Sequence, residues 1–290
     1  MSADHDAPRD VGTAPVQLSS VMQQAVALLH EQPTTVAAAF LAPLQEKLHD
    51  ISMKIQTAFE SGWLESFQQR LQVGVTRIQA AEAALKNAEG IGRMGWTFPM
   101  NVSLTDVVEI LLQVPNGPEA IDAAFARFYA DTEKQSLPLL LAALRQHARL
   151  AEFRALIEEV GFGLEHQKYR LVVTALIPLF EGVARSCWGD SFWQGAARDK
   201  FFKDKIATLA SDGLDHVMWS ATQAFVELLY KKNFHGDPKP RALNRHWILH
   251  GRGPADASLV DALRLLQAIY TVVSLADEEA QDAVQAAPAV

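Results

Sequence analysis

The sequence predicts an all-α protein. Between residues 19 and 276, apolar residues recur almost everywhere at the i, i+3, i+4 spacing that places them on one face of a helix. No stretch shows the strict alternation of apolar and polar residues, bounded by turn residues, that predicts a strand. The 290-residue chain is 49% hydrophobic and 21% charged, an average globular composition. We therefore expect a sizeable core in one large domain or two ordinary ones.

The N-terminal half is expected to be a tail followed by a helical region. Residues 1–18 are polar and lack the apolar segment of a signal peptide, which predicts a flexible tail. Residues 19–148 carry helical stripes, and 103–106 form a capping box that begins a helix. A glycine-rich loop at 90–99 and a turn at 115–118 interrupt the pattern. The first stripe consists of Leu44, Leu48, Ile51, Ile55 and Phe59.

The C-terminal half continues the helical pattern. We expect a boundary near residue 148, although the two halves can still pack as one body. Residues 149–276 would form the second region, and residues 277–290, which are poor in large apolar groups, a second flexible tail. The expected helices cover residues 149–160, 169–187 and 200–232, a short stretch that ends at residue 250, and a last stretch from residue 258.

Cysteine content and hydropathy predict the compartment. Cys187 is the only cysteine, so we expect no intrachain disulfide and no thiolate metal cluster, which fits a reducing environment. The longest apolar runs, Leu171–Phe180 and Leu137–Leu144, are much shorter than the roughly 20 residues that span a bilayer. The sequence therefore predicts a soluble, cytoplasmic protein with no membrane partner.

Two patterns suggest functions that their context does not support. Residues 90–95 match the dinucleotide-binding pattern GxGxxG, but that fingerprint follows a strand and opens a helix at its last glycine. Here a helical pattern precedes it and residues 97–99 read Thr-Phe-Pro, so we interpret it as a connector. Trp188, Phe192 and Trp193 offer base-stacking surfaces, but large aromatic residues in helical bundles are more often core or interface residues.

Charge is distributed unevenly along the chain. The formal net charge of −8 argues against a general nucleic-acid coat. Residues 231–252, however, contain six Lys or Arg and one acid, Asp237, a net charge of +5 that leaves −13 for the remainder. Such a run is often only a solvated surface, but His235, His246 and His250 are interleaved with it. The histidines favour a local anion-binding face that would bind weakly and with strong salt dependence.

This basic segment contains the groups that metal-independent RNA cleavage needs. A histidine can take a proton from a ribose 2′-hydroxyl or give one to the leaving oxygen. The guanidinium of Arg245 can hold the phosphate and stabilise the developing pentavalent charge. Pro240 and Gly251 predict a helix of roughly ten residues, on which His246 and His250 share a face.

Residues 243–252, LNRHWILHGR, resemble the signature of the HEPN superfamily (higher eukaryotes and prokaryotes nucleotide-binding domain). That signature has an arginine, a polar residue, a short apolar stretch and a histidine near the last main helices, and His246 stands here where Asn is frequent. Upstream, residues 169–182 look like the helix of abortive-infection-type HEPN proteins that ends in Glu-Gly. Residues 258–275 would be the closing helix, so the resemblance covers about residues 150–276.

The resemblance implies an up-and-down helical bundle over residues 149–276 and frequent homodimerisation, with a composite cleft from two copies of the motif. It implies a metal-independent endoribonuclease, as in many toxins and phage-defence proteins, although other members are non-catalytic. On this basis Arg245 stabilises the phosphorane, His250 is a general acid or base and His246 assists. The expected partners are RNA or a nucleotide, a second copy and an antitoxin or defence protein, with no cofactor or metal. The expected substrate-binding residues are Asn244, Lys239, Arg241 and Arg252.

Several alternatives stay open. Arg245 and His250 could instead form a buried polar pair that caps the helix. A zinc site from His235, His246 and His250 lacks supporting ligand spacing. Glu181 either orients Arg245 or forms an ion pair elsewhere. For the whole chain, the alternative function is a non-catalytic helical module that binds a nucleotide or a protein.

Overall fold

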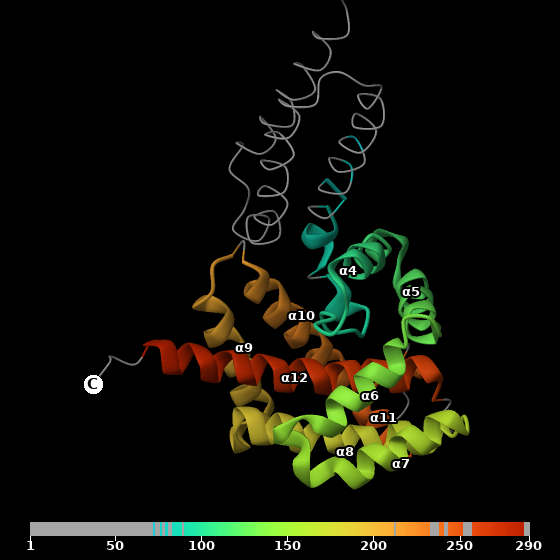
Figure 1. The fold of residues 1–290 in the computed structure, drawn as a ribbon. Coiled ribbons are helices and arrows are strands. Elements are labelled where there is room, and N and C mark those ends of the chain that lie inside the picture. Colours follow the sequence, from blue (N-terminus) through green and yellow to red (C-terminus); the bar gives the residue numbers. More distant parts are fainter. Residues whose placement is uncertain are drawn as a thin grey trace, which may run out of the picture. The chain divides into compact units, whose positions relative to one another are not determined.

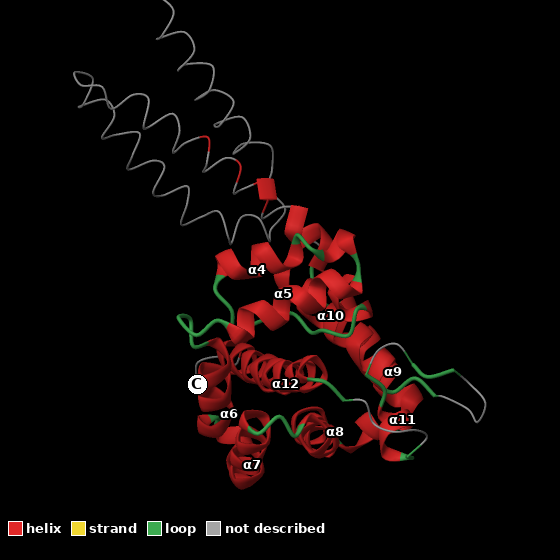
Figure 2. Ribbon diagram, turned by 90° about the vertical axis from the view of Figure 1, so that its right-hand side faces the viewer, coloured by secondary structure: helices red, strands yellow, loops and turns green. Residues whose placement is uncertain are grey.

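The fold is seen in a computed structural model, in which helices are the only regular elements of the described residues (Figures 1 and 2). The all-α prediction is therefore confirmed for this part of the chain. The chain divides into two compact units, residues 1–82 and 83–290. The expected tail at residues 1–18 lies outside the described residues. The structure describes residues 72, 76, 79–80, 83–88, 90–211, 213–232, 238–240, 243–251 and 257–286.

The second unit begins with a helix at residues 83–88 and 90–93. Helix α4 begins directly after Ser103, whose side chain accepts a hydrogen bond from the backbone N–H of Asp106, as the capping box predicts. Three short 3-10 turns lie at Val114–Asn116, Ala148–Phe153 and Asp190–Trp193. The α-helices are α4 (Leu104–Leu111), α5 (Pro118–Ala130), α6 (Ser136–Gln146), α7 (Arg154–Glu165), α8 (Tyr169–Trp188), α9 (Gly195–Ala207), α10 (Leu214–Leu229), α11 (Arg245–Leu249) and α12 (Leu259–Ala286).

Helix α12 is the central element of the second unit. It runs between α8 and α10 and also contacts α5 and α6 (Figures 1 and 2). A helix that contacts neighbours on several sides must be apolar around most of its circumference. The completely buried apolar residues of α12 are Ala262, Leu263, Leu265, Leu266, Ala268, Ile269, Val272, Val273 and Leu275.

Two described helices, Tyr169–Trp188 and Leu259–Gln281, are long and apolar enough to cross a membrane by length and composition alone. Polar residues such as Glu181 and Arg264 interrupt both helices, so neither contains an uninterrupted apolar run of that length. Within the protein, 72% of the apolar window of α12 and 50% of that of α8 are buried. Since α8 and α12 pack against each other, this apolarity is what the core requires. The cytoplasmic location stays a prediction.

Three sequence-based boundaries differ from the structure. Helices on both sides of residue 148 pack against α12 within one unit, whereas the chain divides at residue 82. The single helix expected over residues 200–232 is two helices, because the chain breaks after Ala207 and resumes at Leu214, next to Gly213. The predicted loop at 90–99 begins only after Arg93.

The prediction of a flexible tail from residue 277 is wrong for residues 277–286, which continue α12. Two acids on this segment pair with other helices of the unit or their connections. Asp277 accepts a hydrogen bond of 2.6 Å from Nε of Arg149, and Glu279 lies 2.7 Å from Nζ of Lys205. The composition of the segment suggested a solvated tail, but its charged groups are what attach it to the body.

An extended segment, residues 96–99, lies against α12 and is held there by buried side chains. Gln267 donates its Nε2 to the carbonyl of Thr97 at 2.5 Å and accepts a hydrogen bond of 3.0 Å from the hydroxyl of Tyr129. Thr271 donates to the carbonyl of Phe98 at 3.2 Å. Buried carbonyls that lack partners destabilise a fold, so these side chains determine where the segment lies.

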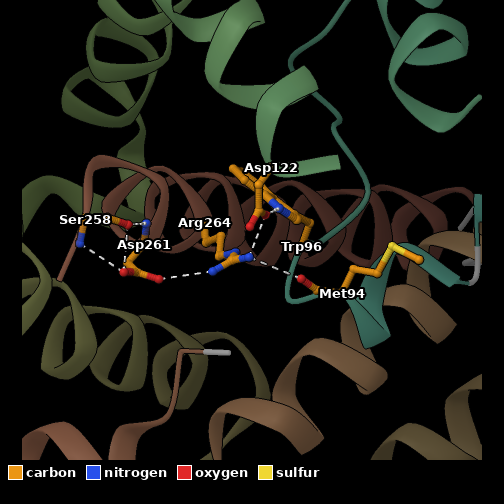
Figure 3. Close-up of polar contacts among 6 residues, drawn as sticks. All are labelled: Met94, Trp96, Asp122, Ser258, Asp261 and Arg264. Carbon is orange, nitrogen blue, oxygen red and sulfur yellow. Dashed lines mark hydrogen bonds and ion pairs between the residues drawn. The ribbon is translucent and has the colours of Figure 1, made fainter. Parts of the chain in front are cut away.

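Arg264 extends this row of polar contacts toward the N-terminal end of α12 (Figure 3). Its Nη2 lies 2.6 Å from the carboxylate of Asp122, and its Nη1 lies 3.0 Å from that of Asp261. The same Asp122 oxygen accepts a 2.8 Å hydrogen bond from Nε1 of Trp96. The Arg264 guanidinium also lies 5.5 Å from the centroid of the Trp96 ring and 3.4 Å from the carbonyl of Met94. One buried cation thus joins α5, α12 and the segment before α4.

Glycine in the GxGxxG pattern serves close packing. A Cβ at Gly92 would lie 2.2 Å from the carbonyl oxygen of Ala221 and 2.7 Å from Cβ of Ala224, both on α10. Gly95 has a φ of 89°, in the left-handed region that favours glycine. The connector interpretation therefore agrees with the structure at Gly95, whereas Gly92 still lies in the preceding helix and packs against α10.

Gly92→Ala is expected to lower the free energy of unfolding by about 2 to 3 kcal/mol, because the new methyl group meets α10 backbone that cannot move aside. Gly182→Ala, within α8, is the matched control, since its Cβ would lie 3.4 Å from the Phe153 ring, an ordinary van der Waals contact. There we expect no loss and a gain of up to about 1 kcal/mol from helix propensity. Urea unfolding of the full chain measures both, and equal effects would contradict the packing argument.

Arg264→Leu is expected to lower the free energy of unfolding by about 3 kcal/mol, because it leaves the partly buried Asp122 carboxylate without its cation. Arg185→Leu removes the arginine of an exposed ion pair with Asp190 and should change that free energy by less than about 1 kcal/mol. Thermal and urea unfolding compare the two variants, and a loss at Arg264 no larger than that at Arg185 would disprove its central role.

Candidate functional site

Helix α11 begins at Arg245 because Asn244 caps it, and it contains five residues. The Oδ1 of Asn244 accepts a 2.9 Å hydrogen bond from the backbone N–H of Trp247, and its Nδ2 donates to the carbonyl of Lys231 at 2.8 Å. The expected ten-residue helix from Pro240 is therefore wrong: the α-helix begins at Arg245. Asn244 is also 3% exposed, so this predicted substrate contact uses its amide inside the protein, to position α11 at the end of α10.

Arg245 points back toward the core of the unit. Its Nε forms an ion pair with Glu181 of α8, which is the first of the two alternatives for that carboxylate. The Arg245 guanidinium lies 5.4 Å from the centroid of the Tyr230 ring, at a cation–π distance. The side chain of Arg245 is 32% exposed and that of Glu181 only 12%. Arg245 is thus anchored from one side while part of it faces solvent.

Tyr230 and Arg198 belong to the same cluster, and sequence reasoning missed both. The Arg198 guanidinium lies 4.5 Å from the centroid of the Tyr230 ring, and Arg198 is 9% exposed. Burial raises the pKa of the Tyr230 hydroxyl, and the negative charge of Glu181 raises it further, while Arg245 opposes both. The one sequence signal for Arg198 is its i, i+4 relation to Phe202, which is 1% exposed.

The structure brings His246 and His250 together, as their spacing predicts. Their ring centroids lie 4.5 Å apart with an angle of 50° between the planes. His250 is exposed and forms the C-cap of α11. Leu249 is 38% exposed, whereas Ile248 packs against the core. The rotation of such a short helix is determined by its cap.

The other predicted substrate contacts are only partly described. Lys239 is exposed and lines a pocket of about 750 Å³, to which Asn244 also contributes. Arg241, Arg252 and His235 lie outside the described residues. Across the described ranges, no group of three or more His, Cys, Asp or Glu side chains is placed to hold a metal ion.

The aromatic residues that offered a base-stacking surface are core residues where the structure describes them. Trp188 is 9% exposed and Phe192 is 2% exposed. The ring centroid of Trp188 lies 5.5 Å from those of Phe192, Phe202 and Trp219. The side chain of Trp193 lies outside the description. The core interpretation is therefore correct for Trp188 and Phe192, whose faces are unavailable to a base.

Comparisons with models of protein families, with curated proteins and with solved structures find no match to this chain. The HEPN resemblance and the sites derived from it therefore stay predictions, and any function must be argued from the residues themselves.

Asn244→Ala is expected to lower the free energy of unfolding by about 1 to 2 kcal/mol through loss of the helix cap. Asn244→Asp keeps the oxygen that caps Trp247 but loses the donor to Lys231, so it separates the two contacts. Hydrogen exchange at the Trp247 amide should accelerate in the first variant and stay slow in the second. Equal acceleration in both would show that the cap does not position α11.

Proposed function

We propose that this chain is a metal-independent endoribonuclease of the HEPN type, acting as a cytoplasmic homodimer in a toxin or phage-defence role. The observation that carries the proposal is the arrangement on α11. Arg245 is held by a buried carboxylate on one side and is 32% exposed, and the His246 and His250 rings contact each other on the same helix. An oriented cation beside imidazole groups is what cleavage of a phosphodiester without a metal requires.

The ion pair with Glu181 supports a positioning role for that carboxylate. An arginine has five N–H donors, and the ion pair with Glu181 involves the Nε atom of Arg245. The terminal nitrogens are left to bind a phosphate in the forked geometry that guanidinium groups favour. Glu181 would therefore orient Arg245 without contacting the RNA.

In the proposed reaction, the ribose 2′-oxygen attacks the adjacent phosphorus and the bond from phosphorus to the 5′-oxygen breaks. A histidine base takes the proton of the 2′-hydroxyl, and a protonated histidine gives a proton to the leaving 5′-oxygen. The products are a 2′,3′-cyclic phosphate and a 5′-hydroxyl. His250, which is exposed, fits one of these roles, and His246 or the second copy in a dimer supplies the other.

A second candidate is a helical module that binds RNA or a nucleotide without chemistry. The contacts that tie α11 to the rest of the unit favour this candidate. Asn244 serves as a cap, and Arg245 is paired with Glu181 and lies at a cation–π distance from Tyr230. On this interpretation Arg245 stabilises the fold, and an antitoxin or defence partner would recognise the surface around it.

Purified protein is expected to cleave RNA in the presence of EDTA and to leave cyclic phosphate ends. His250→Ala should lower the rate by about 100-fold or more, the range for loss of a general acid or base. Arg245→Lys should also lower it, because it keeps the charge opposite Glu181 but loses the fork. His166→Ala is the matched control, because His166 is an exposed histidine that stacks on Phe162 of α7.

Unchanged cleavage by His250→Ala, or cleavage only after addition of a divalent metal, would contradict this mechanism. Binding of RNA without turnover by wild-type protein, together with normal growth of cells that overproduce it, would establish the second candidate instead. The His166→Ala rate separates a specific loss from a general effect of removing a surface imidazole.

A further inference from the structure

A second basic site lies beside α11, in the pocket of about 750 Å³ to which Lys239 contributes. Segments far apart in the sequence meet there. Arg93 ends the first helix of the unit, Lys231 and Lys232 follow α10, and Lys239 precedes α11. The first turn of α5 forms another wall. Sequence reasoning named Lys239 but had no means of placing Arg93 beside it.

The pocket collects positive charge on a chain whose net charge is −8. Its two carboxylates are Asp122, which pairs with Arg264, and Glu119. The described residues that line the pocket thus include four exposed cations, Arg93, Lys231, Lys232 and Lys239, and one carboxylate besides Asp122, that of Glu119. Within the described residues, no carboxylate forms an ion pair with Arg93, Lys231 or Lys232. Converging cations repel one another, and a bound anion of several charges removes that cost.

The floor of the pocket is held in place by contacts that the fold already requires. Arg264 joins Asp122 to the carbonyl of Met94 (Figure 3). All three residues line the pocket. On the other side, Asn244 binds the carbonyl of Lys231. The lysine backbone is thus fixed while its side chain is exposed, so a ligand meets charges on a preorganised frame.

The remaining lining narrows the chemistry of the ligand. Leu228, Pro118 and Pro240 provide apolar surface, and the carboxylate of Glu119 can accept a hydrogen bond from a hydroxyl group. A volume of this size lies within the range of pockets that hold small organic ligands. Several negative charges, an apolar part and hydroxyl groups occur together in nucleotides and in short stretches of RNA.

We propose that this pocket, lined by Arg93, Lys231, Lys232 and Lys239, binds a ligand with at least two neighbouring phosphate groups. Two sources share that chemistry: a free nucleoside triphosphate and the backbone of an RNA strand. The site goes beyond the proposed function, because binding here needs no cleavage and, of the residues assigned to that function, only Lys239 and Asn244 line the pocket.

Isothermal titration calorimetry of the full chain tests the site with three probes: a nucleoside triphosphate, inorganic phosphate, and a 2′-O-methyl RNA oligonucleotide that cannot be cleaved. The Lys231→Ala, Lys232→Ala double variant should weaken the preferred probe by about tenfold or more. The matched control is Lys200→Ala, Lys203→Ala, which removes two exposed α9 lysines that do not line the pocket. All three proteins should unfold at the same temperature, since the substituted side chains are exposed.

The probes also distinguish the two sources. If RNA is the ligand, the negative slope of log affinity against log salt concentration should become shallower by about 1.4 in the Lys231, Lys232 variant. This is about 0.7 for each lost phosphate contact. If the triphosphate is the ligand, it should bind more tightly than the RNA, and Arg93→Ala should weaken it as well. Either pattern supports the site and identifies its ligand.

Three results would overturn the proposal: no binding of the triphosphate or the RNA, equal losses in the double variant and the α9 control, or inorganic phosphate binding as tightly as the other probes. The proposed function fails separately. Binding that depends on Lys231 and Lys232 in a protein that never cleaves RNA would leave this site standing and remove the nuclease. Cleavage that depends on His250, together with unchanged ligand binding in the Lys231, Lys232 variant, would support the nuclease and remove this site.

Discussion

Three polar side chains on the most buried helix, Arg264, Gln267 and Thr271 of α12, hold the backbone of residues 94–98 against the core. Within the part of α12 between Ala262 and Val273, which is otherwise apolar, they are spaced by three and four residues, so they form one stripe. Because buried carbonyls need partners, the segment has one place to lie. That position brings Trp96 onto Phe125, with ring centroids 3.9 Å apart, and thereby places α5. The packing of the N-terminal half of this unit follows from this stripe.

The contacts of Arg264 with Asp122 and Met94 also form the floor of the candidate ligand pocket, so the fold and this site are not independent. Arg264 neutralises Asp122 at the floor, which leaves the cations above it without a counter-charge from that residue. Asn244 forms the corresponding link on the other side. It caps α11, which carries Arg245 and His246 and ends next to His250, and it also binds the backbone carbonyl of Lys231 just after α10. Both proposed sites thus depend on a few buried polar groups.

The parts that sequence predicted well depend on local patterns. Helical spacing predicted the all-α class, the capping box predicted the start of α4, and the i, i+4 spacing predicted the contact between His246 and His250. The parts that it missed depend on distant contacts. Arg198 lies beside Tyr230, and Arg93 lines the same pocket as Lys231, only because separate helices pack together. The polar composition of residues 277–281 predicted a flexible tail, but Asp277 and Glu279 pair with Arg149 and Lys205 on other elements.

The sequence by itself determined the helical class, most helix positions and the basic segment, because each depends on residues within a few turns of one another. Only the tertiary structure decided what the polar residues of that segment do. Asn244 became a cap, Arg245 became the partner of Glu181, and Lys231 and Lys232 became the edge of a pocket. The physical reason is that burial and charge pairing depend on contacts between elements far apart in the chain. The spacing of residues along one helix does not predict which other elements that helix will contact.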